Sequence, residues 1–287
     1  IILNLIGSIY YRLGETDRAS SYYKKLLKLN PNNLQAIINL GTLYNDKGKK
    51  ELALKYFSVA CKQAPENNKY VRKFLKTFQT TSFTVYNEDI AKIILTLLAK
   101  PSLLKPIQLS YSIFSLLKKH PETIDILNNF HRLNEESFQE STIEKIKDIK
   151  LLKEYMELAP ITDIQFEAIL LRLRSLIIKR QLKNYSTDLD FTTSLSIQCF
   201  VNEYIFYESE DDTSNIIKLE KRIDKASKDK KELSMNDIVT LALFRPISKY
   251  NWKKEINNQN QDHRIKKLLK IQIEEVHEEV TISKSIK

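Results

Sequence analysis

The sequence predicts an all-α protein in which stacked helical hairpins are followed by an irregular all-helical domain. Three pairs of residues recur at one interval of 34, namely Gly7 and Gly41, Gly14 and Gly48, and Pro31 and Pro65. An interval of this length is typical of a repeated helical hairpin that buries its apolar face against its neighbours. Apolar residues at helical spacing continue through the rest of the chain, which contains no glycine after Gly48.

The glycines inside the two first helices mark a close contact. Leu3, Ile6 and Tyr10 fall on one face of a helix with Gly7 among them, and the same pattern returns around Gly41. Glycine inside a helix costs about 1 kcal/mol relative to alanine. Its use twice at the same phase therefore predicts that a neighbouring helix packs there with no room for a side chain.

Glycine and proline also predict where the helices of these units end. Gly14 and Gly48 follow the last periodic residue of each first helix, where glycine readily forms a left-handed cap. Pro31 and Pro65 close the second helices, because proline disfavours helical geometry in the residue before it. The second helices carry apolar stripes at helical spacing, namely Ala19, Tyr23 and Leu26 in the first unit and Ala53, Phe57 and Ala60 in the second.

This pattern of small, aromatic and proline residues resembles the tetratricopeptide repeat. We expect three repeats, the third of them degenerate or capping, at residues 1–33, 34–67 and 68–100. In the third unit Val71, Phe74 and Phe78 form a core face, but both glycines are missing. The resemblance implies an α-solenoid whose first helices line a groove that binds a protein or peptide.

Residues of the first helices that lie away from the packing stripe are the candidate ligand contacts. Most are polar and can form hydrogen bonds with an extended peptide backbone. In the first two units they are Asn4, Ser8, Tyr11, Arg12, Gln35, Ile38, Asn39, Thr42 and Asn45.

The first helix of the third unit is cationic instead. Opposite its core face lie Lys69, Arg72, Lys73 and Lys76. One interpretation is that they face the groove and capture carboxylates of an acidic peptide or of a chain terminus. The other is that they form the solvated face of a capping helix. The sequence leaves both interpretations open.

The charge of the chain is concentrated in the repeats. Lys and Arg exceed Asp and Glu by 9 within residues 1–79 and by only 1 within residues 80–287. A basic surface can also bind nucleic acid, but the aromatic residues that would stack on bases fall on the packing stripes. We therefore expect a protein or peptide partner rather than nucleic acid.

Residues 101–287 are expected to form a separate helical domain. Helical periodicity continues there without the 34-residue phase, and prolines and N-cap residues separate the segments. The expected helices are residues 107–118, 121–133, 142–158, 162–182, 192–207, 214–226, 235–243 and 263–277. The stretches 184–190 and 208–212 are expected to be loops.

Three segments of this region, Gln198–Phe206, Phe244–Ile247 and Gln272–Glu279, carry a second resemblance. They resemble the helical region that, in bacterial tetratricopeptide-repeat methyltransferases, joins the repeats to an S-adenosylmethionine-dependent catalytic domain. The resemblance implies a larger parent protein in which this chain positions a substrate. The alternative is that the helical domain completes the methyltransferase active site, with contacts near Asn202 and Glu203.

The chain itself is expected to hold no catalytic residue, cofactor or metal. A glycine-rich turn, which brings backbone amides close to S-adenosylmethionine or a phosphate, is missing after Gly48. Histidines are scattered, and Cys61 and Cys199 lie far apart on apolar faces, so neither a metal site nor a disulfide is predicted.

The expected setting is the cytoplasm. No stretch is apolar for long enough to span a membrane, and the few cysteines fit a reducing compartment. Because the chain starts at Ile1 inside a repeat, we expect a fragment with repeats upstream and a catalytic domain downstream. The leading hypothesis is a non-catalytic scaffold that binds a protein or peptide.

Overall fold

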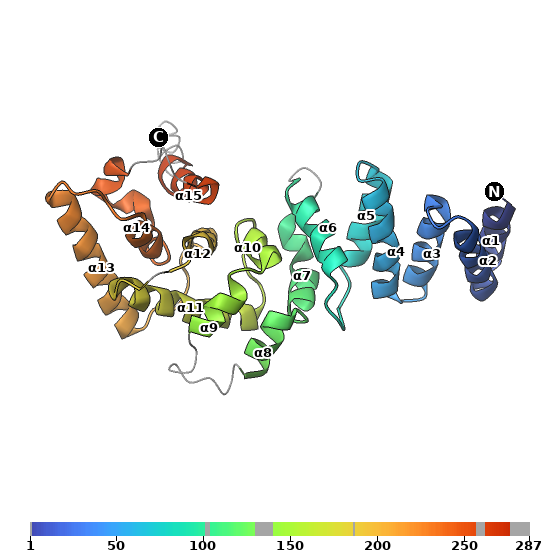
Figure 1. Cartoon of the computed structure of the whole chain (residues 1–287), viewed down its shortest axis with the longest axis horizontal. Helices are drawn as coiled ribbons and strands as arrows, with labels where there is room; N and C mark the ends of the chain where they lie inside the picture. The colour runs from blue at the N-terminus through green and yellow to red at the C-terminus, as the bar shows by residue number, and fades with distance from the viewer. Residues whose placement is uncertain (1, 101–103, 130–139, 186, 257–261, 276–287) are drawn as a thin grey trace, which may run out of the picture. The chain divides into compact units, whose positions relative to one another are not determined.

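The chain is helical throughout the residues that the structure describes, so the all-α prediction is confirmed. The computed structural model describes residues 2–100, 104–129, 140–185, 187–256 and 262–275, and all regular structure within these ranges is helical (Figure 1). The chain divides into two compact units, residues 1–124 and 125–287. The sequence places a boundary after residue 100 instead, and independent folding of residues 101–287 stays a prediction.

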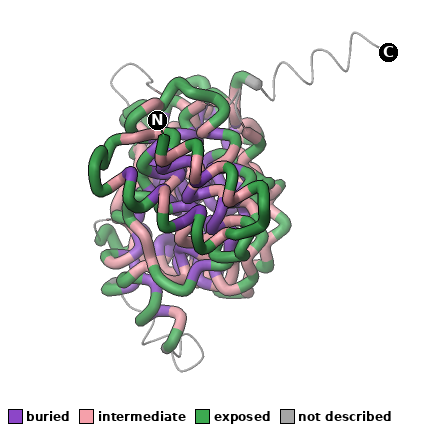
Figure 2. Tube along the Cα trace, turned by 90° about the vertical axis from the view of Figure 1, so that its right-hand side faces the viewer, coloured by how far each residue is buried: buried purple, intermediate pink, exposed green. Residues whose placement is uncertain are grey.

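The first unit is a row of helices that starts with two hairpins. Its elements are α1 (Ile2–Arg12), α2 (Thr16–Leu29), α3 (Leu34–Asp46), α4 (Lys50–Gln63), α5 (Asn68–Phe78), α6 (Glu88–Leu98), η1 (Pro106–Leu109) and α7 (Ser110–Leu117), with α8 (Pro121–Asn129) crossing the division. Helices α1 and α2 pack closely, as do α3 and α4, and α4 also packs against α5. Buried positions lie inside and exposed ones outside (Figure 2).

A glycine and an aromatic ring set the spacing of each hairpin. A Cβ atom added to Gly7 would lie 2.6 Å from Cε1 of Tyr23, and one added to Gly41 would lie 2.5 Å from Cε1 of Phe57. Both rings are 2% exposed. The predicted close contact is therefore confirmed, and in each repeat its partner is the aromatic residue of the second helix.

The turns within the hairpins also follow the prediction. Gly14 and Gly48 have φ values of +80° and +72°, a conformation that costs other residues about 1 kcal/mol or more. Each first helix ends two residues before its glycine. The hairpins are alike in their aromatic pairs too, because Tyr10 stacks on Tyr22 at 5.4 Å and Tyr44 on Tyr56 at 5.6 Å.

The third unit has both predicted helices but lacks the tight hairpin. Helix α6 packs against α4 more than against α5. Leu75 stands 34 residues after Gly41 and is itself buried, so α5 offers no glycine against which a second helix could close. The leucine in place of the glycine is therefore the steric reason why the third unit is degenerate.

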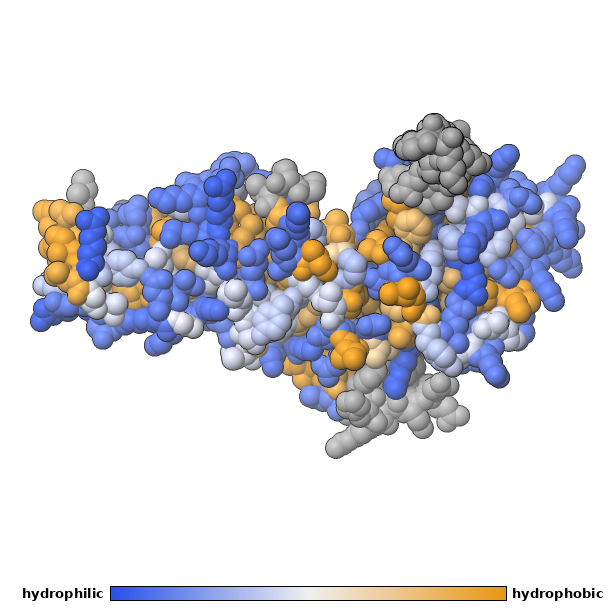
Figure 3. Space-filling model, turned by 180° about the vertical axis from the view of Figure 1, so that it is seen from behind, coloured by the Kyte–Doolittle hydropathy of each residue, from blue (hydrophilic) through white to orange (hydrophobic). Residues whose placement is uncertain are grey.

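The N-terminal edge of the first unit is apolar. Ile2, Leu5, Ile9 and Leu13 on and beside α1 are 73%, 61%, 49% and 66% exposed. The apolar surface is visible at the N-terminal end in Figure 3. One repeat later, Ala36 and Leu43 replace Ile2 and Ile9 and are fully buried, because the preceding hairpin covers α3.

The second unit has helices of more varied length. They are α9 (Glu140–Ile146), α10 (Lys150–Met156), α11 (Ile164–Leu182), α12 (Leu189–Val201), α13 (Glu210–Lys228), α14 (Met235–Leu241), η2 (Ile247–Lys249), η3 (Asn251–Glu255), α15 (His263–Leu269) and the π-helical turn η4 (Lys270–Glu275). Helix α12 lies at the centre, since it contacts α10, α11, α14 and α15. All nine residues from Phe191 to Cys199 are buried.

Several predicted boundaries in this unit are wrong. The predicted helix 142–158 is two helices, because the chain turns at residues 147–149 and buries both Ile146 and Ile149. The predicted loop 208–212 is mostly the first turn of α13. There Ser209 and Asp212 form a capping box, and acidic residues are favourable at this end of a helix.

Two other predicted helices end early. The predicted helix 192–207 stops at Val201, because Glu203 and Tyr204 take φ values of 53° and 56°. The predicted helix 263–277 changes to a π-helical turn after Leu269. The end of this helix at residues 276–277, and that of the helix predicted at residues 121–133, lie outside the described residues.

Replacing Gly41 by alanine tests the close contact between α3 and α4. Alanine gains about 1 kcal/mol of helix propensity, but overpacking against the buried Phe57 ring costs about 1–3 kcal/mol. We expect Gly41→Ala to lower the urea midpoint measured by far-ultraviolet circular dichroism. Fluorescence of Trp252, the one tryptophan, reports the second unit and should not change.

The second variant of this test is Gly41→Ala combined with Phe57→Leu. It should recover part of the loss, because the smaller side chain makes room for the added methyl group. A Gly41→Ala protein as stable as the unmodified chain would contradict the proposed contact.

Candidate peptide-binding surface on the repeats

Most of the predicted groove residues form one polar surface, which we call the first-helix surface. It consists of the exposed and half-buried polar side chains of α1, α3 and α5, together with the buried Thr77. Between α1 and α3, Nδ2 of Asn39 donates to Oδ1 of Asn4 at 3.0 Å. Nε2 of Gln35 donates to Oδ1 of Asn39 at 2.9 Å, which extends the chain of amides. Oγ of Ser8 donates to the carbonyl oxygen of Asn4 at 2.9 Å.

Further hydrogen bonds link α3 to α5, so the surface extends over all three helices. Nζ of Lys73 donates to Oγ1 of Thr42 at 3.1 Å, and Oγ1 of Thr77 donates to Oδ1 of Asn45 at 3.2 Å. The three first helices are thereby linked in order through polar side chains. A row of donors and acceptors with regular spacing suits the backbone of an extended peptide.

Tyr11 and Asp46 form a separate link between α1 and α3. The Tyr11 hydroxyl donates to Oδ2 of Asp46. This hydrogen bond, together with partial burial and the carboxylate charge, raises the pKa of Tyr11 to about 12. Tyr11 therefore stays protonated and remains a donor at neutral pH.

The cationic residues predicted on α5 are not neutralised within the protein. Lys69, Arg72 and Lys76 are exposed, and Lys73 is half-buried beside Thr42. None of the four forms an ion pair with a carboxylate in the described ranges, and α5 contains no acidic residue. The α5 end of the first-helix surface thus carries positive charge.

Two of the predicted contacts lie differently from the rest. Ile38 is 4% exposed and packs in the core, so its side chain offers nothing to a ligand. Arg12 is exposed at the end of α1. Sequence reasoning missed Asp46 and Thr77, which lie 35 residues after Tyr11 and Thr42. The signal that could have identified them is this spacing, which is one repeat plus one residue from a predicted contact.

The comparisons agree with this architecture. A family model described as the tetratricopeptide repeat matches residues 2–33 and 34–67. Residues 2–67 are two tetratricopeptide repeats. The match includes the paired glycines, the aromatic partners and most of the first-helix surface, whereas the cationic helix α5 follows it. Repeats of this kind mediate protein–protein interactions.

One relative is similar to part of this chain. The chain is 33% identical over 90 residues to photosystem I assembly protein Ycf3 of Acaryochloris marina (strain MBIC 11017). The similarity covers 26% of this chain and 54% of that protein, so the chain spans about half the length of the relative.

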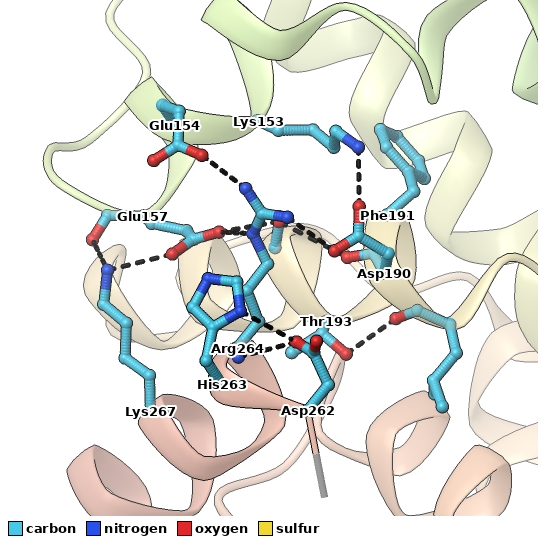
Figure 4. Close-up of polar contacts among 12 residues, drawn as sticks. Lys153, Glu154, Glu157, Asp190, Phe191, Thr193, Asp262, His263, Arg264 and Lys267 are labelled. Atoms are coloured by element: carbon cyan, nitrogen blue, oxygen red, sulfur yellow. Dashed lines mark hydrogen bonds and ion pairs between the residues drawn. The ribbon is translucent and has the colours of Figure 1, made fainter. Parts of the chain in front are cut away.

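The second unit contains a dense ionic cluster around Arg264 of α15 (Figure 4). Nε of Arg264 donates to Oε1 of Glu157 at 2.5 Å, and Nη1 donates to Oδ1 of Asp190 at 2.6 Å. Nη2 contacts Glu154. Lys267 pairs with Glu157 at 2.9 Å. These contacts tie α15 to α10 and α12.

The charges of this cluster offset one another. Burial would raise the pKa of Glu157, but Lys267, Ser194 and Arg264 outweigh burial and lower it. The pKa of Asp190 is lowered in the same way by Lys153 and Arg264. Carboxylates held ionised by adjacent cations are poor proton donors, so we assign the cluster a structural role.

The three segments that resemble the methyltransferase-associated region meet in space. Nε2 of Gln272 donates to the hydroxyl of Tyr204 at 3.0 Å, and Oε1 of Gln272 accepts from the amide of Ile247 at 3.0 Å. The Tyr204 hydroxyl donates to the carbonyl oxygen of Ala242 at 3.1 Å. This arrangement is a satisfied packing contact. Glu203 lies exposed in the turn after α12.

The described ranges show neither a metal cluster nor a membrane span. No three His, Cys, Asp or Glu side chains of these ranges gather as ligands for a metal ion would. Every helix in them is too short or too polar to cross a bilayer. Cys61 and Cys199 are both buried and free. The cytoplasmic setting stays a prediction.

Replacing Arg264 by methionine tests the ionic cluster. The change leaves Glu157, whose side chain is 4% exposed, with fewer partners, and breaking a buried pair costs about 3 kcal/mol or more. We expect a lower urea midpoint by Trp252 fluorescence at pH 7. Lys266→Met, on the exposed face of the same helix, should change stability by less than about 0.5 kcal/mol.

The same pair of variants has a predicted pH dependence. Because the folded-state pKa values of Glu157 and Asp190 lie below their unfolded values, their stabilisation is complete above the unfolded values. It is lost as the pH falls through the lowered pKa values. The gap between the Arg264→Met protein and the unmodified chain should therefore narrow below about pH 4. A gap that is the same at pH 3 and pH 7 would contradict the assignment.

Proposed function

We propose that this chain recognises an extended, acidic segment of a partner protein on the first-helix surface. The observation that carries the proposal is the polar row across α1, α3 and α5, which ends in four cations without an acidic partner among the described residues. Backbone groups of the segment would bind the amides of Asn4, Asn39 and Asn45. Its carboxylates would bind the cations of α5.

The positions of these groups support binding of the partner segment in one direction. The α1 and α3 part of the surface carries one cation, Arg12, and one anion, Asp46, which accepts a hydrogen bond from Tyr11. The α5 part is positive. A partner segment whose negative charge is concentrated at one end would therefore bind in one direction, and attraction between opposite charges would also speed its association.

The similarity to Ycf3 supports a role in assembly. That relative is named for the assembly of photosystem I, and it is similar to the present chain over 90 residues. We propose that the repeats here likewise hold a partner while a larger complex or reaction is organised. The identity of the partner is not part of the proposal.

The methyltransferase parent stays a second proposal, with S-adenosylmethionine bound outside this chain. It rests on the three resembling segments, which meet around Gln272. The variant of this proposal in which Asn202 and Glu203 complete an active site has less support, because Glu203 is exposed in a surface turn.

A peptide array on the 287-residue chain tests the proposed function. Binding to random 12-residue peptides should enrich sequences rich in Asp and Glu. The triple variant Lys69→Ala, Arg72→Ala and Lys76→Ala should lose at least about tenfold in affinity for these peptides, because three charge-assisted contacts disappear.

A second triple variant with the same net charge provides the control. Lys25, Lys28 and Lys55 are exposed on the second helices, and replacing them with alanine should leave binding unchanged. Binders without acidic enrichment that depend on Asn39 would support the surface but overturn the acidic ligand. Binding that is insensitive to both Asn39→Ala and the α5 variant would overturn the proposed function itself.

A further inference from the structure

The turn that follows α12 exposes two large apolar side chains close together. It comprises residues 203–208, and we call it the 203–208 turn. Ile205 is 82% exposed and Tyr207 is 80% exposed, more than almost all other large apolar side chains that the structure describes. Single exposed apolar residues are common on protein surfaces and need no explanation. Two of them in one short turn do need one.

The residues next to these two side chains are anchored to the second unit. The hydroxyl of Tyr204 donates to the carbonyl oxygen of Ala242 at 3.1 Å and accepts from Nε2 of Gln272 at 3.0 Å. At the other end of the turn, Nη2 of Arg245 donates to Oε2 of Glu208 at 2.8 Å, and Nη1 contacts the second oxygen of the same carboxylate. The two ends of the turn are therefore both fixed.

The middle of the turn is anchored to α11. The ring centre of Phe206 lies 5.4 Å from the central guanidinium carbon of Arg174. Nη2 of the same arginine donates to the carbonyl oxygen of Tyr207 at 2.7 Å. Side chains along the turn thus alternate between those that bind the protein and those that are left in solvent, namely Ile205 and Tyr207.

Two residues of the turn have a backbone conformation that favours glycine. Glu203 and Tyr204 take φ values of 53° and 56°, which bulky residues rarely adopt. The amides of these two residues donate to the carbonyl oxygens of Phe200 and Cys199, which caps the end of α12. Backbone strain of this kind persists only where surrounding contacts hold it, and it is frequent at binding sites.

The surroundings of the exposed pair are acidic, although the whole chain has a net charge of +10. No Lys, Arg or His occurs between Lys183 and Lys218. Glu208 is engaged by Arg245, but Glu203 and Glu210 are exposed and form no ion pair within the described ranges. The two exposed apolar side chains are therefore flanked by negative charge that the protein does not neutralise.

We propose that the 203–208 turn is a docking site for a basic, amphipathic helix of a partner protein. Ile205 and Tyr207 would contact the apolar face of this helix. Glu203 and Glu210 would pair with lysine or arginine side chains beside that face, so the charges of the two surfaces are complementary. Because the turn is already anchored, it loses little conformational freedom on binding.

Other kinds of partner fit this surface less well. The chain bends at Phe206, so the turn offers no straight edge with which an extended strand could pair. The free carboxylates would repel nucleic acid and anionic lipid. The turn belongs to the second unit and binds a ligand of opposite charge to the one proposed for the repeats, so the two proposals are independent.

Fluorescence anisotropy of a labelled peptide tests this proposal on the 287-residue chain. The peptide is built from leucine and lysine over about four helical turns, with all leucines on one face, and a scrambled peptide of the same composition is its control. The patterned peptide should bind at least about tenfold more tightly than the scrambled one, because only the patterned peptide presents an apolar face. Ile205→Ser combined with Tyr207→Ser should weaken its binding at least about tenfold.

Two pairs of substitutions complete the design. Leu13→Ser combined with Leu29→Ser is the matched control, because these leucines are 66% and 77% exposed in the first unit, and it should leave binding unchanged. Glu203→Gln combined with Glu210→Gln should weaken binding and reduce its dependence on salt. All these positions are exposed, so the unfolding midpoint followed by Trp252 fluorescence should stay the same.

Three results would overturn the proposal. One is equal affinity of the patterned peptide for the unmodified chain and for the variant changed at Ile205 and Tyr207. Another is equal binding of the patterned and scrambled peptides. The third is a dimer in sedimentation equilibrium that dissociates in the same variant, since a second copy would then occupy the turn. Binding of acidic array peptides should not change in this variant, so failure here leaves the function proposed for the repeats standing.

Discussion

The close contact between a glycine of the first helix and an aromatic ring of the second determines the geometry of the repeats. At Gly7 and Gly41 even a methyl group would come within about 2.6 Å of the rings of Tyr23 and Phe57. Because protein interiors are densely packed, such a contact fixes the distance between two helices within narrow limits. Where Leu75 replaces the glycine, α5 and α6 no longer close into the same hairpin.

The spacing of the hairpins in turn positions the polar side chains. Equal hairpins bring successive first helices side by side, so that Asn4 reaches Asn39 and Thr42 reaches Lys73. Helix α5 follows the last regular hairpin and carries the cations, so the positive charge lies at one end of the polar row. The same 34-residue period thus places both the packing contacts within the hairpins and the polar side chains of the proposed recognition surface.

The sequence predicted the parts of the structure that depend on local patterns. The glycines and prolines located the hairpins, and their apolar stripes identified the core. Helix boundaries in the second unit were predicted less well. The helix ends at Ile146, and the following turn buries both Ile146 and Ile149. No residue at this point of the sequence indicates that the helix ends there. The acidic stretch that forms the first turn of α13 was predicted to be a loop, although Ser209 and Asp212 form a capping box. The cluster around Arg264 joins residues more than 100 positions apart, which a single sequence cannot bring together.

Hydrogen–deuterium exchange of the whole chain with and without an acidic peptide selected from the array measures the central claim most directly. The account predicts slower exchange in α1, α3 and α5, whose side chains form the first-helix surface, and unchanged exchange in α2 and α4. Protection confined to the second helices or to residues 140–275 would contradict it.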